Sequence, residues 1–247
     1  MAITITGKVV IVTGGTGEMG SSISRRLVQE GAKVVVADIR EDAALLAGLA
    51  KDGEAIFVKT DITSEAETMA LAKAAEAKFG RIDAVVNNAG LFTALPWDQL
   101  TLAEWQTRMR VNVDGVFLVT KAVEPIMTKN GGGKIINIGS DTVWMGTPGF
   151  AHYVASKAAV LGFTRAIANE LGPRGITSVY VTPTLLDTPG TRQAFPQGHF
   201  DYVLGHTPIG RLETPEDVNG LIVFLCSDEA AFINGAAINI GGGISMH

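Results

Sequence analysis

Short runs of β-branched residues alternate along the chain with longer stretches in which apolar residues recur every three or four positions. The runs are nearly continuous in Val and Ile, as expected for strands buried on both faces of a parallel sheet. They predict seven strands, at 8–13, 33–38, 55–59, 82–87, 134–139, 176–182 and 237–240. The longer stretches predict helices at 19–30, 41–51, 64–79, 101–129, 151–171 and 215–225.

This alternation predicts an α/β fold, a doubly wound, seven-stranded parallel sheet of the Rossmann type with helices on both faces. No internal repeat or long linker divides the chain, so we expect residues 1–247 to form a single domain. The segment 184–206 interrupts the rhythm with prolines, glycines and aromatic residues. A loop of this length is typical of a substrate lid, the alternative being a solvated excursion with a short helix.

Composition and charge narrow the class of protein. Apolar residues make up 47% of the chain and charged residues 18%, which favours a buried core. The net charge of −5 disfavours nucleic-acid binding, and no apolar run reaches the roughly 20 residues of a membrane span. The N-terminus does not resemble a signal peptide, and Cys226 is the single cysteine. We therefore expect a cytoplasmic protein, and the histidine spacing suggests no metal site.

A glycine-rich turn follows the first predicted strand. In "TGGTGEMG" (13–20), Gly15, Gly17 and Gly20 satisfy G-x-G-x-x-G between a strand and a helix. Such a turn brings the backbone close to a pyrophosphate, and the next helix presents free N–H groups and partial positive charge. The turn therefore predicts a dinucleotide site rather than a structural bend.

The end of the second strand indicates which dinucleotide binds. Asp38 closes "KVVVAD", where a carboxylate can accept both ribose hydroxyls of NAD and repel the 2′-phosphate of NADP. Arg40 lies close enough to weaken this preference by pairing with that phosphate. The sequence predicts NAD rather than NADP.

Tyr153 and Lys157 lie four residues apart in a stretch with helical periodicity, which places them on one helix face. A phenol normally titrates near a pH of about 10, and a neighbouring ammonium favours the phenolate. Ser140 ends the strand "KIINIGS", where a hydroxyl can reach a ligand at the sheet edge. The three residues suit acid–base chemistry on an alcohol or a carbonyl.

At this point the chain resembles the short-chain dehydrogenase/reductase family over essentially its whole length. The glycine turn is accompanied, in the family's order, by "NNAG" (87–90), "VNVDG" (111–115), "IGS" ending at Ser140, "YVASK" (153–157), "ITSVYVTP" (176–183) and a near-terminal "INIGGG". This joint occurrence is highly specific, whereas a Tyr-x-x-x-Lys pair alone is common on amphipathic helices.

The resemblance implies a role for each matching residue. Tyr153 is the acid/base, Ser140 steadies the substrate oxygen, and Lys157 also holds the nicotinamide ribose. Asn112 is implied to position a water in a proton relay that reaches Lys157. The residues implied to bind the cofactor are Gly14, Gly17, Met19, Asp38, Asp61 (at the adenine), Ile62, Asn88, Ala89, Gly90, Lys157, Pro183, Thr184 and Thr188 (at the carboxamide).

Several positions depart from the family pattern. The branch of this length usually has glycine where this chain has Glu18. The helix dipole favours a carboxylate there by about 0.3–1 kcal/mol, but the pyrophosphate repels it. We therefore expect the Glu18 side chain to point to solvent and to weaken NAD binding modestly. Thr184 replaces a glycine, which requires a reshaped loop if the backbone there is left-handed. Met19 and Ser178 are milder replacements.

The substrate pocket is expected to be largely apolar, which suits a small aromatic or alicyclic alcohol. Some of its aromatic residues are equally typical of core or subunit-interface positions. Trp144, Phe150 and His152 resemble the pattern of dehydrogenases of aromatic secondary alcohols such as 1-phenylethanol, and "GTP" (146–148) is similar to pyridoxal dehydrogenases. The expected lining is Ser140, Trp144, Phe150, Tyr153 and Leu185, together with Met145, Phe195, Phe200 and Tyr202.

The chain is thus predicted to be an NAD-dependent oxidoreductase that interconverts a secondary alcohol and its ketone by hydride transfer. One alternative is a 3-oxoacyl thioester reductase, which would favour NADP and a basic surface. Another is a non-catalytic dinucleotide-sensing protein. The resemblance also implies a homotetramer or homodimer that pairs through the helices predicted at 101–129 and 151–171.

Overall fold

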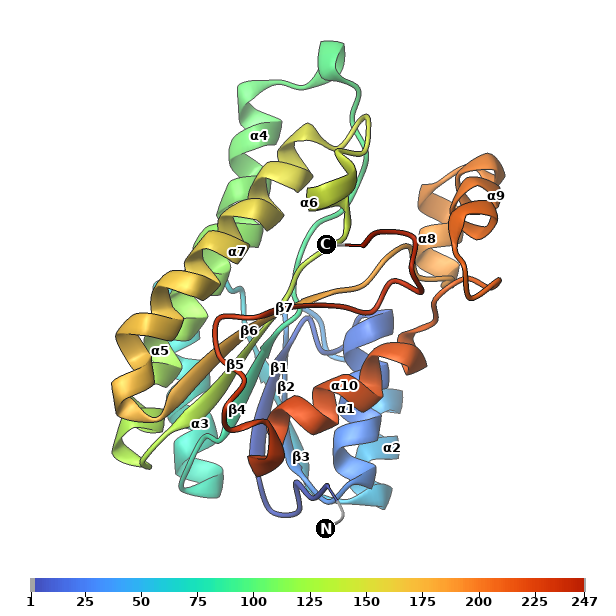
Figure 1. Cartoon of the computed structure of the whole chain (residues 1–247). Coiled ribbons are helices and arrows are strands. Elements are labelled where there is room, and N and C mark those ends of the chain that lie inside the picture. The colour runs from blue at the N-terminus through green and yellow to red at the C-terminus, as the bar shows by residue number, and fades with distance from the viewer. Residues whose placement is uncertain (1–2, 247) are drawn as a thin grey trace.

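The computed structural model describes residues 3–246 and contains one seven-stranded sheet (Figure 1). The spatial order is β3-β2-β1-β4-β5-β6-β7, and every neighbouring pair is parallel. The strands are β1 (Val9–Thr13), β2 (Lys33–Asp38), β3 (Ala55–Lys59), β4 (Ala84–Asn87), β5 (Gly133–Ile138), β6 (Ile176–Thr182) and β7 (Ala237–Asn239). The predicted α/β fold class is confirmed, and the strand boundaries differ from the predicted ones by at most two residues.

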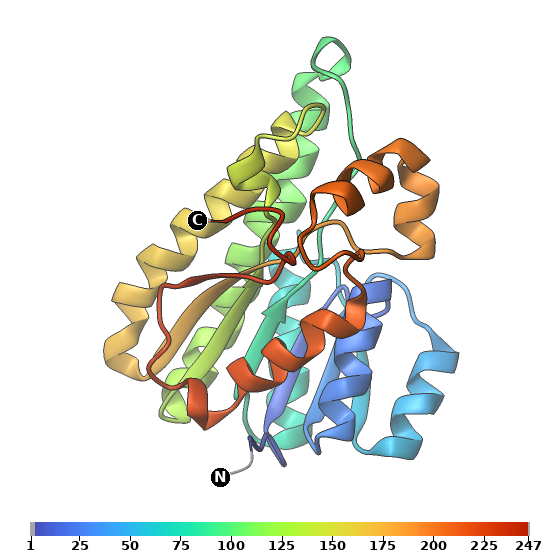
Figure 2. The same ribbon diagram turned by 45° about the vertical axis from the view of Figure 1, so that its right-hand side comes forward.

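Helices cover both faces of this sheet (Figures 1 and 2). On one face α1 (Glu18–Gln29), α2 (Ala43–Asp52) and α10 (Pro215–Cys226) pack on apolar strand residues. On the other lie α3 (Glu65–Phe79), α5 (Gly115–Lys129) and α7 (Ala151–Leu171). Because both faces are covered, the strands are apolar almost throughout, as in the fully buried VVIVT of β1.

Capping side chains decide where several helices begin. The Asp42 carboxylate accepts the Leu45 N–H, and the Ser64 hydroxyl accepts the Glu67 N–H. These caps satisfy N–H groups that have no partner inside the helix. Helices α2 and α3 therefore start one or two residues later than the apolar periodicity predicted.

The long helix predicted at 101–129 is interrupted. It consists of α4 (Leu102–Met109), a π-helical turn at Arg110–Asp114, and α5. A π turn inserts one extra residue and reorients the side chains within it. The turn contains Asn112, whose side chain is discussed below.

The segment 184–206 folds into two short helices, α8 (Pro189–Ala194) and α9 (Gln197–His206). Figure 2 shows them above α1, beyond the upper ends of the strands. The start of α8 is a reciprocal cap, in which the hydroxyls of Thr188 and Thr191 accept each other's backbone N–H. The remaining helix, α6 (Thr142–Met145), follows β5 and was not predicted. Within the described residues no helix is long and apolar enough to cross a membrane.

Candidate active site

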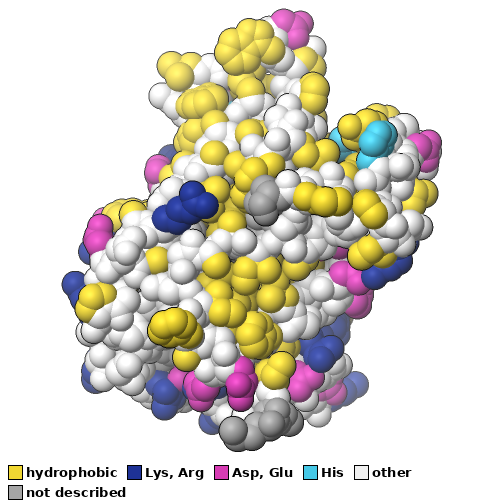
Figure 3. Space-filling model, viewed as in Figure 1, with side chains coloured by type: hydrophobic (Ala, Val, Ile, Leu, Met, Phe, Trp, Pro, Cys, Tyr) yellow, Lys and Arg dark blue, Asp and Glu magenta, His cyan; other side chains and the backbone are white. Residues whose placement is uncertain are grey.

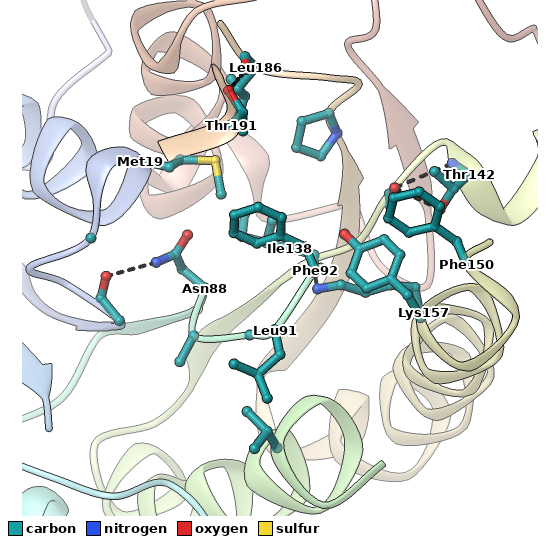
Figure 4. Close-up of a pocket in the computed structure, with 18 of the residues that line it drawn as sticks. Met19, Asn88, Leu91, Phe92, Ile138, Thr142, Phe150, Lys157, Leu186 and Thr191 are labelled. Atoms are coloured by element: carbon teal, nitrogen blue, oxygen red, sulfur yellow. Dashed lines mark hydrogen bonds between the residues drawn. The ribbon is translucent and has the colours of Figure 1, made fainter. Parts of the chain in front are cut away.

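A large cavity opens at the carboxyl ends of the strands, with a volume of about 1370 Å³. It spans the point between β1 and β4 where the strand order reverses, the usual ligand crevice of an open parallel sheet. One end is lined by the glycine turn and Asp38, and the other by Ser140, Tyr153 and residues of α8 and α9. In Figure 4, Met19 and Asn88 lie on one side of the cavity, and Phe150 and Lys157 on the other.

The glycine turn has the close approaches that a phosphate-binding turn requires. A Cβ on Gly20 would lie 2.1 Å from the Gly14 carbonyl oxygen, and Gly14 itself has a φ of +61°. The Asn88 amide donates to the carbonyl oxygens of Thr13 (2.8 Å) and Gly14 (3.1 Å), which fixes the turn. The N-cap residue of α1 is Gly17, which has no side chain to cap the helix, and the first residues of α1 line the cavity. This cradle fits a dinucleotide pyrophosphate.

The acidic residues at the ends of β2 and β3 also line the cavity. Asp38 accepts the backbone N–H of Thr16 (3.2 Å) and of Arg40 (3.3 Å), so its carboxylate is held beside the turn. Asp61 accepts the backbone N–H (2.9 Å) and hydroxyl (2.8 Å) of Thr63. Ile62 lies between them on the cavity wall. Both carboxylates can therefore face the adenosine half of a cofactor.

The sequence predicted that the Glu18 side chain points to solvent, but in the structure it contacts another segment of the protein. Its carboxylate accepts the backbone N–H of Gly190 at 2.8 Å, in the first turn of α8. The cofactor turn is thereby joined to a segment 172 residues further along the chain. Glycine suits position 190 because a Cβ there would come within 2.8 Å of the Glu18 carboxylate.

Tyr153 and Lys157 lie on α7, and Ser140 lies two residues after the end of β5. All three line the cavity. Burial raises the pKa of Tyr153 to about 12, while the Ser140 hydroxyl and then the Arg108 charge oppose the rise. Burial also lowers the pKa of Lys157 to about 8. The Lys157 ammonium donates to the Ile138 carbonyl at 2.7 Å and lies 5.6 Å from the Tyr153 ring centroid. The site therefore contains a neutral phenol beside an amine that can lose its proton.

Asn112 lies behind this group, in the π turn. Its amide oxygen accepts the Leu91 N–H at 2.8 Å, and its amide nitrogen donates to the Leu91 carbonyl at 3.0 Å and to Ser156 at 3.0 Å. A Cβ on Gly90 would contact the Asn112 oxygen at 3.3 Å and the Lys157 nitrogen at 3.7 Å. Asn112 and Lys157 thus flank the same glycine.

The strained backbone considered for Thr184 does not occur. No non-glycine residue among those described has a positive φ. Instead the Thr184 N–H donates to the Glu213 carboxylate at 2.6 Å. Thr184 lines the cavity together with Pro183, Leu185 and Thr188, so the loop keeps its contact with the cofactor end without glycine.

Aromatic side chains form the wall beside Tyr153. Phe150 meets Tyr153 edge-on at 5.8 Å between centroids, and Phe195 of the loop after α8 lies 5.8 Å from Phe150 and 6.2 Å from Phe92. Two predicted lining residues lie elsewhere. Trp144 packs edge-on against Tyr180 at 6.2 Å, and Phe200 is buried under Arg192, outside the set that lines the cavity.

Three side chains next to the site were not singled out from the sequence. Asp141 follows Ser140, Glu213 precedes α10, and Arg108 of α4 is buried 3.2 Å from His152. A buried arginine or acid has no distinctive sequence signal, because the same residue in the same pattern is usually on the surface. His152 itself turns toward α4, as expected for a neighbour of a cavity-facing tyrosine.

The fold and this site define the class of protein: the chain belongs to the short-chain dehydrogenase/reductase family. The family model described as Enoyl-(Acyl carrier protein) reductase matches residues 14–245. The chain is 38% identical to a 3-oxoacyl-[acyl-carrier-protein] reductase of Synechocystis sp., with 98% of both chains covered. It is also 38% identical to the cyclopentanol dehydrogenase of Comamonas sp., with 98% of this chain and 99% of the relative covered.

A solved structure gives the same picture. A 7 alpha-hydroxysteroid dehydrogenase in complex with NADH and 7-oxo glycochenodeoxycholic acid superposes with a TM-score of 0.94 at 34% identity. The match covers 98% of this chain and 95% of that one. The relatives thus support an oxidoreductase of this family, and they act on substrates of several kinds.

Proposed function

We propose that this protein is an NAD-dependent dehydrogenase that interconverts a secondary alcohol, aromatic or cyclic, with its ketone. The observation that carries the proposal is one continuous cavity with a pyrophosphate cradle at one end and the Ser140, Tyr153 and Lys157 group at the other. A sensor that binds dinucleotide without turnover would have no need of this second group.

The residues that would hold NAD are those along the cradle and the sheet edge. The turn from Gly14 to Met19 would receive the pyrophosphate, Asp38 the adenosine ribose, and Asp61 with Ile62 the adenine. Asn88, Ala89, Gly90 and Lys157 would hold the nicotinamide ribose, and Pro183, Thr184 and Thr188 the carboxamide. When bound, the nicotinamide supplies the two-electron redox step. The position of Asp38 favours NAD over NADP by charge repulsion.

The protein's own part is to orient the substrate and to move one proton. Ser140 would hydrogen-bond the reacting oxygen, and Tyr153 would take the hydroxyl proton in oxidation or return it in reduction. The raised pKa of Tyr153 makes the neutral phenol the resting form, which is ready to act as an acid on a ketone. Lys157 would pass the proton onward, and Asn112, which flanks the same Gly90, would position the water of that relay.

The segment 184–206 is proposed to be the substrate lid. It carries Phe195 onto the aromatic wall and brings Thr188 to the cofactor end. The apolar lining, with Phe92 and Leu186 added to Phe150 and Leu185, suits an aromatic or alicyclic substrate.

A second candidate is a 3-oxoacyl thioester reductase, which is favoured by the name of the Synechocystis relative and of another in Thermotoga maritima at 35% identity. That activity would favour NADP and a basic surface for an acidic carrier. Asp38 and the net charge of −5 count against it.

The test is NADH formation by the purified protein on 1-phenylethanol, cyclohexanol, pyridoxal and a 3-hydroxyacyl thioester, with NAD and NADP in parallel. We expect turnover with NAD on the aromatic or cyclic alcohols. Tyr153→Phe should reduce kcat by about 10²–10⁴-fold or more while NADH still binds. Tyr202→Phe, at an exposed cavity-lining phenol, is the matched control and should remain active. Substantial turnover by Tyr153→Phe would refute the assignment.

A further inference from the structure

Two buried carboxyl groups lie beside the start of the segment 184–206. Asp141 is 2% exposed and Glu213 5% exposed. Each has one oxygen, Oδ2 of Asp141 and Oε1 of Glu213, with no hydrogen-bond partner among the described residues. A fully ionised carboxylate in such a position is costly, because neither water nor a donor solvates the free oxygen.

Thr184 lies between the two acids. Its N–H donates to Glu213 Oε2 at 2.6 Å, and the residue before it, Pro183, accepts the Asp141 N–H at 3.2 Å. The backbone of Glu213 also contacts this segment. The Asp187 N–H donates to the Glu213 carbonyl at 2.7 Å, and Leu186 forms a β-bridge with Glu213. Glu213 therefore fastens the chain where the segment leaves the sheet to the place where it returns toward α10.

Among the described residues no cation forms an ion pair with either acid. Neither Asp141 nor Glu213 takes part in a salt bridge within residues 3–246. The Arg211 charge opposes the rise of the Glu213 pKa only weakly, and Arg211 donates two hydrogen bonds of 2.6 Å to Asp217 instead. The other groups that act on the pair are Asp217, the phenols of Tyr153 on α7 and Tyr180 on β6, and the backbone N–H of Thr142 beside Asp141.

We propose that Asp141 and Glu213 form a coupled acid pair that holds one proton and one negative charge at neutral pH, and that this charge state positions Thr184 and sets the electrostatic environment of Tyr153. Both are positioning residues in this proposal, since they act through Thr184 and Tyr153. The pairing stands on the structure alone, and its effect on Tyr153 rests on the proposed function.

The physical reason is the mutual repulsion of like charges without solvent. Two carboxylates that share a dry site cannot both ionise easily, so their protons leave in two separate steps that belong to the pair. Burial, the largest cause, raises the pKa of Asp141 to about 6 and that of Glu213 to about 8. The Asp141 charge adds to the rise at Glu213 and also raises the pKa of Tyr153. Between these two values the pair carries one charge.

The first measurement is the pH dependence of unfolding for the wild type and Glu213→Gln, at equal protein concentration. The amide is isosteric, and its oxygen can still accept the Thr184 N–H. A carboxyl whose pKa is raised by folding stabilises the protein at low pH, and this contribution is lost as pH rises through the folded value. As pH rises from about 5 to 8, the wild type should therefore lose stability relative to Glu213→Gln. The unfolding constant of the wild type divided by that of the variant should rise by up to tenfold per pH unit.

Two controls separate this effect from a general change of charge. Glu216→Gln removes an exposed carboxylate three residues away and should give a ratio that does not vary in this way. In an Asp141→Asn background the like charge is gone, so the Glu213 titration should move to lower pH. A flat ratio for Glu213→Gln, or a titration that Asp141→Asn leaves unmoved, would overturn the proposal.

Infrared difference spectroscopy keeps the test decisive if Asp141→Asn does not fold. The wild type at pH 7 should show a protonated-carboxyl band that Glu213→Gln lacks, and absence of that band would also overturn the pair. Once a substrate is known, the rate of alcohol oxidation should rise less steeply above pH 8 in the wild type than in Glu213→Gln, with KM little changed, because ionisation of Glu213 adds a negative charge that opposes the Tyr153 phenolate. Identical alkaline profiles would refute the effect on Tyr153. Inactivity on every substrate would refute only the proposed function, because the unfolding and infrared results need no turnover.

Discussion

At the scale of single residues, the phenol of Tyr153 is held between opposing charges. The Arg108 guanidinium lowers its pKa, and the Asp141 carboxylate raises it. Arg108 is itself bound by neutral partners, Thr93 at 2.7 Å and His152 at 3.2 Å. Burial and the Arg108 charge lower the pKa of His152, so the imidazole is neutral and accepts from the guanidinium. A buried cation whose hydrogen-bond partners are neutral is only partly compensated, here by the charge of Glu104.

We therefore predict that Arg108→Gln makes the Tyr153 phenolate harder to form. The pH midpoint of kcat/KM for alcohol oxidation should move upward, and the rate at neutral pH should fall by up to about tenfold. Arg108→Lys keeps the charge and should restore much of the rate. Arg165→Gln, at an exposed position on α7, should leave the profile in place. An unshifted profile in Arg108→Gln would mean that the arginine only packs.

The site residues that the sequence predicted depend on local patterns, and those that it missed depend on contacts with distant parts of the chain. The glycine turn, Asp38, Ser140 and the Tyr153–Lys157 pair are predictable, because each depends on a short local pattern beside a strand or within one helix. The roles of Glu18, Asp141 and Glu213 depend on partners far along the chain. Glu18 contacts Gly190 and Glu213 contacts Thr184, and periodicity says nothing about such pairs.

At the scale of elements, caps and local exchanges of hydrogen bonds set the helix boundaries around the site. The start of α10 is an example. The Asp217 carboxylate accepts both the N–H and the hydroxyl of its cap residue Thr214. Arg211 donates two bonds to the same carboxylate, and these bonds, as the largest cause, lower the pKa of Asp217 to about 2. This arrangement holds α10 in place immediately after Glu213.

Asp217→Asn should therefore destabilise the protein by about 1 kcal/mol at neutral pH, as for the loss of a helix cap. A depressed folded pKa contributes stability above the unfolded value, and the contribution is lost as pH falls through the folded value. The difference between variant and wild type should thus shrink as pH falls from about 4 to 2. Urea denaturation over this range measures it. A difference that stays constant with pH would show that the charge is not its source.

The strands and the helices that cover the sheet were the most predictable elements, because nearly continuous runs of Val and Ile indicate a sheet that is covered on both faces. The π turn at Arg110–Asp114 and the two helices of the segment 184–206 were not predictable. The π turn continues the helical pattern in sequence and differs only in its hydrogen bonds. The helices α8 and α9 have little amphipathic pattern, because they lie over a cavity rather than on a core.

At the scale of the whole molecule, apolar side chains remain on the surface. Figure 3 shows hydrophobic side chains at the tip of the molecule above α4, and Trp97 and Leu102 near that tip are 79% and 70% exposed. On α5, Phe117 is also exposed and packs edge-on against Phe163 of α7 at 6.4 Å. We propose that α4, α5 and α7 pair with a second copy of the chain, because exposed aromatic groups of this kind mark contact surfaces.

Phe117→Arg should then yield a smaller species than the wild type in light scattering coupled to gel filtration. The charge would be buried without a partner at the centre of the contact, which is strongly unfavourable. Phe232→Arg, at a fully exposed phenylalanine away from these helices, is the matched control and should leave the mass unchanged. A wild type that already elutes as a monomer would contradict the proposed pairing.

The contact between Glu18 and Gly190 has a consequence for anyone who redesigns this protein. A residue in the turn that we propose cradles the cofactor also holds the first turn of the segment that we propose covers the substrate end. Substitutions made to change cofactor preference at this turn will also alter the roof of the other pocket. Cofactor choice and substrate range are therefore not separate modules in this chain, and libraries that vary positions 18 and 190 together will sample combinations that single-site libraries miss.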